Sequence, residues 1–242
     1  MKVTAFSNNL YQLTRLVAFN CYLVREDDGF TLIDTNMGGQ AQAIMQEAGK
    51  LGLPIARILL THAHIDHVGS LDALHQALPD VQVAISERDA RFLTGDKSLD
   101  PTEPQVPLRG GYPICSTKPT LLLHEGDRIG SLEVVATPGH TPGHIAFLDT
   151  RDRAVIAGDA YQTQGGVAVS GTFELLFPLP AFATWHKGLA LESARKLLAL
   201  SPSVLAVGHG RMLSQPQAAM KRAIHVMERS LAKEERKQSH VA

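Results

Sequence analysis

The sequence has few cysteines and no long apolar run. Its 242 residues include only Cys21 and Cys115, too few for a disulfide framework, so we expect free thiols. No stretch approaches the roughly 20 apolar residues of a transmembrane helix. The segment from Met1 to Leu10 also lacks the basic start and apolar run of a signal peptide. These absences favour a soluble cytoplasmic protein without a membrane partner.

The chain also lacks an excess of charge of either sign. It has 23 basic and 24 acidic residues, for a net charge of −1. Such a balance gives no electrostatic footprint for nucleic acid, so we expect no nucleic-acid partner. Apolar residues make up 44% of the chain, which is typical of a globular protein. We expect a single domain over residues 1–242.

Apolar runs and breakers predict an α+β fold. Two β-rich halves, each with its own helices, indicate two sheets packed face to face and covered by helices. Two long irregular loops are expected, at 94–119 and 162–183, and such loops are often functional. The predicted strands are 17–24, 29–33, 55–60, 81–85, 121–123, 132–137, 145–148, 154–157 and 204–207. The predicted helices are 40–51, 66–77, 184–200 and 215 to about 237.

Histidines and aspartates follow the ends of four predicted strands. Groups at one end of rigid sheets can converge, so these side chains are candidates for a shared site. Singly, each has a plain structural explanation: a lone histidine is commonly buried for packing, and an aspartate after a strand can cap a helix. The candidate metal ligands are His62, His64, Asp66, His67, His140, Asp159 and His209.

The spacing of the first four residues favours metal binding over those explanations. His62 and His64 lie two residues apart, so in extended chain they point the same way. Four ligand-type residues within six positions are improbable in an apolar core. Imidazole and carboxylate groups suit zinc, and also iron or manganese. Seven ligands exceed what one tetrahedral ion needs, whereas two ions sharing a carboxylate would use them all.

The motifs resemble those of the metallo-β-lactamase superfamily. The cluster His62-Ala63-His64-Ile65-Asp66-His67 matches the family's His-x-His-x-Asp-His signature. The segment 137–144 is similar to its third-histidine loop, and Ala157-Gly158-Asp159 and Gly208-His209-Gly210 to its later motifs. The resemblance covers residues 17–210. It implies a four-layer αββα sandwich with the site at one edge of the sheets.

The resemblance also implies roles for the ligands. His62, His64 and His140 would hold a first divalent ion. Asp66, His67 and His209 would hold a second, and Asp159 would bridge both. Zinc is the expected metal, with iron and manganese as alternatives. The ions would supply a hydroxide that attacks a substrate carbonyl, and Asp66 would also pass a proton to the leaving group.

Three further residues are candidates for supporting roles. Asp34 could orient a ligand histidine, or form a turn. His144 could also support a ligand, or simply begin a strand. Tyr161 could reach the substrate oxygen, or pack at the surface.

The resemblance narrows the substrate to a small molecule with an ester, lactone or thioester carbonyl. Asp159 stands where zinc β-lactamases usually carry cysteine, so antibiotic hydrolysis is not expected. An N-acyl homoserine lactonase is the preferred hypothesis. A glyoxalase II-like thioesterase is an alternative, although only 33 residues follow His209. A catalytically silent metal-binding scaffold is another. The apolar residues of 173–182 predict either an acyl-binding lid or a homodimer contact.

Overall fold

The computed structural model describes residues 1–239. Its first sheet has seven strands in chain order, from β1 to β7. Strands β1 to β4 pair antiparallel, and β4 to β7 pair parallel. The strands are β1 Lys2–Ala5, β2 Leu10–Arg15, β3 Phe19–Glu26, β4 Gly29–Ile33, β5 Ile55–Leu59, β6 Gln82–Ser86 and β7 Leu121–Leu123.

The second sheet has six strands in the order β15–β14–β11–β10–β9–β8. Strands β11 and β14 pair parallel, and their neighbours pair antiparallel. These strands are β8 Arg128–Ile129, β9 Leu132–Ala136, β10 Ile145–Asp149, β11 Ala154–Ile156, β14 Val204–Ala206 and β15 Leu213–Ser214. A separate short hairpin joins β12 Tyr161–Gln162 to β13 Ala168–Val169.

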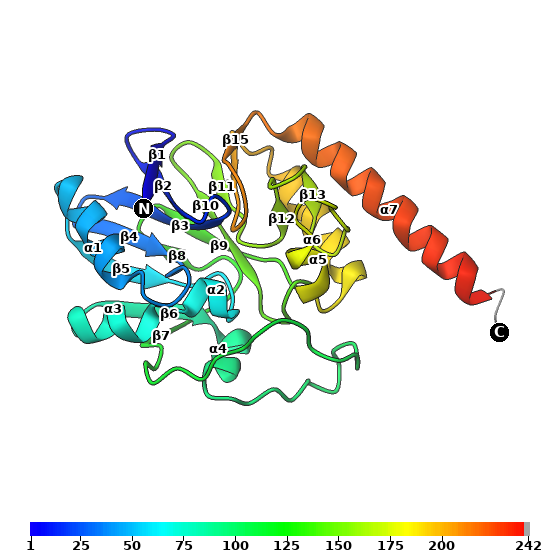
Figure 1. The fold of residues 1–242 in the computed structure, drawn as a ribbon, viewed down its shortest axis with the longest axis horizontal. Helices are drawn as coiled ribbons and strands as arrows, with labels where there is room; N and C mark the ends of the chain where they lie inside the picture. The colour runs from blue at the N-terminus through cyan, green and yellow to red at the C-terminus, as the bar shows by residue number, and fades with distance from the viewer. Residues whose placement is uncertain (240–242) are drawn as a thin grey trace.

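Three apolar cores separate four layers. Tyr22 and Ile33 of the first sheet meet Phe147 of the second in the core between the sheets. A second core lies between the first sheet and helices α1, α3 and α4, and a third lies between the second sheet and helices α6 and α7. Figure 1 shows these helices on the two outer faces. The predicted αββα sandwich is therefore confirmed. The helices are α1 Ala41–Lys50, α2 Ile65–Val68, α3 Leu71–Ala77, α4 Glu87–Leu93, α5 Leu179–Ala183, α6 Lys187–Ala199 and α7 Gln217–Ser239.

Two predicted elements differ from the structure. The strand expected at 17–24 begins only at Phe19, because Leu16 and Val17 form a turn with φ angles of 48° and 68°. The helix expected at 66–77 is two helices, α2 and α3, with Gly69 and Ser70 between them. A Cβ on Gly69 would lie 2.5 Å from the Gly38 nitrogen, so the backbone there closely approaches the loop that contains Gly38.

The two predicted irregular loops have different outcomes. Segment 94–119 is free of helix and strand, as predicted. The prediction for 162–183 was only partly correct, since this segment contains β13 and α5.

The cysteine prediction is confirmed, because Cys21 and Cys115 are free thiols. None of the helices in the described part of the chain is long and apolar enough to cross a membrane.

Candidate metal centre

The seven predicted ligands come together at one edge of the two sheets. His62 and His64 follow β5, Asp66 and His67 lie in the single turn of α2, and the other three follow β9, β11 and β14. Helix α2 begins directly after the extended His64, so the chain changes direction within the motif. That change lets one short segment direct side chains toward two different places.

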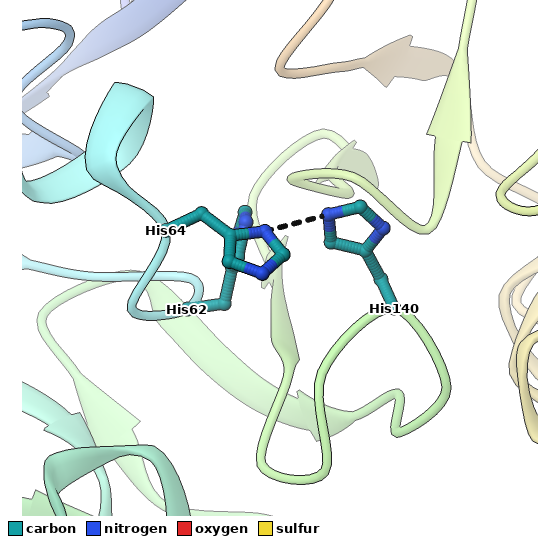
Figure 2. Close-up of side chains that lie close together, drawn as sticks. All are labelled: His62, His64 and His140. Carbon is teal, nitrogen blue, oxygen red and sulfur yellow. Dashed lines mark hydrogen bonds between the residues drawn. The ribbon is translucent and has the colours of Figure 1, made fainter. Parts of the chain in front are cut away.

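The first set consists of three buried imidazoles. Figure 2 shows His62 and His64 on one loop and His140 on another, with the rings of His64 and His140 facing each other. His64 Nδ1 lies 3.0 Å from His140 Nε2. One nitrogen from each of the three rings lies within 4.8 Å of the others, which is close enough for them to share an ion.

The second set contains a carboxylate and two imidazoles. His209 Nε2 lies 3.3 Å from Asp66 Oδ2, and His67 Nε2 lies 4.0 Å from the same oxygen. Asp159 lies between the two sets. Its Oδ2 is 3.3 Å from His140 Nε2 and 3.0 Å from His209 Nε2, and its Oδ1 is 3.3 Å from His67 Nε2. This carboxylate therefore contacts ligands of both sets.

Hydrogen bonds on the outer side of the rings fix which nitrogens face inward. His67 Nδ1 lies 2.7 Å from Asp34 Oδ2, so it donates to this carboxylate. Thr61 Oγ1 donates to the same oxygen at 2.8 Å and can then accept from His62 Nδ1 at 3.0 Å. His64 Nε2 lies 3.0 Å from the carbonyl of Arg109, which only accepts. The opposite nitrogens of these rings therefore point into the cluster.

The inward atoms fit bound cations. The buried His62 Nε2, His67 Nε2 and Asp159 Oδ1 have no hydrogen-bond partner. Buried polar atoms without a partner are rare and call for an explanation. The lone pair of His64 Nδ1 faces His140 at hydrogen-bond distance, an arrangement that a cation between them would stabilise. Imidazole and carboxylate donors suit divalent transition metals.

The two sets differ in their protonation. Burial lowers the pKa of His62 and His140 well below the ordinary value, and it lowers that of His64 to about 4. Burial also lowers the pKa of His209, but the Asp159 and Asp66 carboxylates outweigh it and raise the pKa to about 9. The pKa of His67 is likewise raised, despite its burial, by Asp159, Asp34 and Asp66. The first set therefore offers lone pairs near neutral pH, and the second set holds protons beside its carboxylates.

The sequence identifies the family to which the chain belongs. Residues 15–209 match the profile of the metallo-beta-lactamase superfamily. The chain belongs to the metallo-β-lactamase superfamily. It is a metal-dependent hydrolase with a His/Asp cluster for divalent metals.

Relatives within the superfamily include named hydrolases. The YobT protein of Bacillus subtilis (strain 168) is 51% identical and aligns over 93% of this chain and 97% of its own length. The probable metallo-hydrolase YflN of the same organism is 32% identical over 84% of each chain. The hydroxyacylglutathione hydrolase GloC of Haemophilus influenzae is 32% identical over 79% of this chain and 85% of its own.

Solved structures of superfamily members share the fold. TTHA1623 in a di-iron-bound form is 29% identical, with a TM-score of 0.63 over 85% of this chain and 94% of that one. The DIM-1 metallo-beta-lactamase is 16% identical, with a TM-score of 0.71 over 95% and 97%. At that identity the second likeness shows the fold alone.

Two predicted supporting residues of this metallo-β-lactamase fold contact the cluster. Asp34 has a φ angle of 60°, rare for a non-glycine residue, and its carboxylate accepts from His67 and from the Thr61 backbone. The backbone nitrogen of Asp159 donates to His144 Nε2 at 3.0 Å. His144 Nδ1 lies 2.8 Å from Thr137 Oγ1. Asp34 thus contacts a ligand ring, and His144 contacts the backbone of the residue between the two sets.

The structure corrects the expectation for Tyr161. Its side chain is buried in the core beneath α6, and its hydroxyl donates to the carbonyl of Ala194 at 2.9 Å. Residues two apart share a direction only in an extended chain. Residues 158–160 form a turn before β12, so Tyr161 and Asp159 point to different places. Tyr161 is a packing residue.

Asp89 is a buried carboxylate that the motifs did not reveal. It lies in α4 and accepts from the Ala63 nitrogen at 3.1 Å, from Thr141 Oγ1 at 2.7 Å and from the Gly143 nitrogen at 2.7 Å. These donors flank His62, His64 and His140, so Asp89 joins the two loops that carry the first set. A lone aspartate in an ordinary helix gives no sequence signal of such a role.

Proposed function

We propose that this chain hydrolyses an ester-type bond of a small carbonyl substrate at a centre of two divalent ions. The observation that carries the proposal is the position of Asp159. It contacts both a set of three imidazoles and a set with Asp66. One inward nitrogen of each set, His62 Nε2 and His67 Nε2, has no hydrogen-bond partner. One shared carboxylate between two such sets suits a pair of ions.

These contacts support one assignment of ligands to the two ions. His62, His64 and His140 would hold one ion, Asp66, His67 and His209 the other, and Asp159 both. When bound, such ions supply a hydroxide near neutral pH and polarise a carbonyl oxygen. Zinc is the first candidate metal. Iron is the second, because the 29% identical TTHA1623 was solved in a di-iron-bound form.

Asp66 is proposed to move a proton as well as bind an ion. Its side chain is 22% exposed, whereas the side chains of His67, Asp159 and His209 are at most 3% exposed. The His67 and His209 rings outweigh its burial and hold the pKa of Asp66 well below the ordinary value. This carboxylate lies at the open side of the cluster, where a departing group would lie. Its low pKa would make a proton that it accepts in passing easy to release to that group.

A thioester is the first candidate substrate class, and a lactone the second. The hydroxyacylglutathione hydrolase GloC supports the thioester, and 85% of its length aligns with this chain. Tyr161 points away from the cluster, so its hydroxyl does not reach a substrate oxygen there. The exposed apolar side chains of Phe173, Leu175 and Leu176 still favour an acyl chain, as in a long-chain lactone.

The test is a comparison of kcat/KM on S-lactoylglutathione and on an N-acyl homoserine lactone. The enzyme is loaded with two equivalents of zinc or iron, and chelator-treated protein is the control. We expect metal-dependent hydrolysis with a preference for the thioester. A preference for the lactone would reverse the order of the two classes. No hydrolysis of either, with two ions bound, would favour a silent metal-binding scaffold.

A further inference from the structure

Segment 94–119 contacts the first set of ligands through its backbone. The Arg109 carbonyl lies 3.0 Å from His64 Nε2, on the side of the ring opposite His140. Because this carbonyl only accepts, it holds the His64 proton on Nε2 and leaves the Nδ1 lone pair facing inward. A residue in an irregular segment 45 positions away thereby fixes the tautomer of a metal ligand.

The next residue leaves no room for a side chain. Gly110 has a φ angle of 85°, and a Cβ there would lie 2.7 Å from His64 Cε1 and 2.9 Å from His64 Cδ2. Gly111 is different, since a Cβ there would make an ordinary 3.4 Å contact with Ile65. The ring of Tyr112 then packs on His64, with centroids 4.6 Å apart. Three of the four positions 109–112 therefore lie close around one imidazole, and Gly111 has space for a side chain.

The segment is fastened at two points shortly before this contact. At the first, Arg88 of α4 forms a two-pronged ion pair with Glu103, at 2.6 and 2.8 Å. At the second, Trp185 Nε1 donates to the Val106 carbonyl at 3.1 Å, while the Trp185 backbone nitrogen donates to the His140 carbonyl at 3.0 Å. Trp185 therefore joins the segment to the loop that carries the third imidazole.

We propose that segment 94–119 is a positioning element of the first metal set. The Arg109 carbonyl orients His64, Gly110 allows the close approach, and Trp185 ties the segment to the His140 loop. The inference rests on the proposed metal centre and is independent of the substrate. It assigns a positioning role at the metal centre to a segment that the sequence predicted only as an irregular loop of a kind that is often functional.

The test compares Gly110→Ala with the neighbouring Gly111→Ala as a matched control. Chelator-treated proteins are titrated with zinc against a chromophoric competing chelator. Partners that orient metal ligands are typically worth about 10- to 100-fold in metal affinity. We expect Gly110→Ala to bind the ion of the first set more weakly by that factor and to bind the other ion as the parent protein does. Gly111→Ala should bind both ions like the parent protein.

Equal binding by Gly110→Ala and Gly111→Ala would overturn the inference. An equal loss of affinity for both ions in Gly110→Ala would also overturn the inference, because it would indicate that the substitution disturbs the whole site. Failure of the parent protein to bind two ions would instead contradict the metal centre itself. If Gly110→Ala does not fold, Trp185→Phe gives a second test, since it keeps a ring and removes the bond to Val106. Loss of that hydrogen bond should lower the affinity for one ion about fivefold, and unchanged affinity for both ions would contradict the proposal.

Discussion

The two ligand sets meet at Asp159 but differ in how they are held. His62, His64 and His140 are buried imidazoles whose pKa values are lowered, chiefly by burial. His67 and His209 are equally buried, yet nearby carboxylates raise their pKa values. Burial alone therefore does not decide whether a histidine here carries a proton. The number of carboxylates in contact with the ring decides whether the histidine carries a proton.

This difference predicts different binding behaviour of the two ions. An ion can enter the first set near neutral pH without displacing protons. An ion in the second set must displace protons from His67 and His209, so its affinity should rise with pH. The predictions below test this contrast, beginning with the largest expected effect.

The largest effect should come from removing one ligand of either set. We expect His64→Ala and His209→Ala each to bind one ion in place of two and to lose roughly 10³-fold in kcat/KM, since an ion contributes several kcal/mol to the transition state. The affinity of the ion left in His64→Ala should fall as pH is lowered from 9 to 6.5, because it uses the protonated set. The ion left in His209→Ala should show much less pH dependence. Identical pH profiles would contradict the contrast.

A smaller effect on metal affinity is expected when Asp34, which holds the outer nitrogen of His67, is changed. Asp34→Asn replaces a carboxylate that accepts from both His67 and Thr61. We expect the second ion to bind about 10- to 100-fold more weakly and the first to change far less. Competitive chelator titration measures both affinities, with the exposed Asp80→Asn as the control. A loss confined to the first ion would contradict the assignment of Asp34.

The stability of the metal-free protein should depend on pH through the second set. The carboxylates of Asp159 and Asp66 outweigh burial and raise the pKa of His209 in the folded protein to about 9, above its ordinary value of 6.5. The resulting stabilisation is fully present below pH 6.5 and is lost as pH rises through 9. Thermal unfolding of chelator-treated protein should therefore show a falling Tm over this range. The metal-loaded protein should not show the same fall, and parallel curves for the two forms would count against the argument.

The smallest effect is expected at Tyr161. Tyr161→Phe removes one hydrogen bond to the Ala194 carbonyl and nothing at the cluster. We expect a loss of about 1 kcal/mol in the free energy of unfolding and little change in kcat/KM. Denaturant unfolding and steady-state kinetics measure the two quantities. A large loss of kcat with unchanged stability would restore a role in catalysis.

The layers and the members of the His/Asp cluster were predictable because their signals are local. Apolar runs such as 55–60 end directly at His62 and His64, and the motif spacing keeps these residues together in any fold with that strand. The sequence did not reveal Asp89, because its three donors come from segments 26 to 54 residues away. The direction of Tyr161 also depends on a turn that strand periodicity does not describe.

The edge of the first sheet was missed for a related reason. Strand β1 is short and largely exposed, so it lacks the apolar run on which the prediction relied. The contact between Arg109 and His64 was likewise invisible, because a backbone carbonyl has no sequence signature. Sequence patterns thus located the side chains of the His/Asp cluster, and tertiary contacts decided which groups orient them.

The most direct test of the account is the anomalous diffraction of crystals of the metal-loaded protein. We expect two peaks, one among His62, His64 and His140, and the other among Asp66, His67 and His209, with the Asp159 carboxylate between them. A single peak, or two peaks without Asp159 as a shared ligand, would contradict the proposed dinuclear centre.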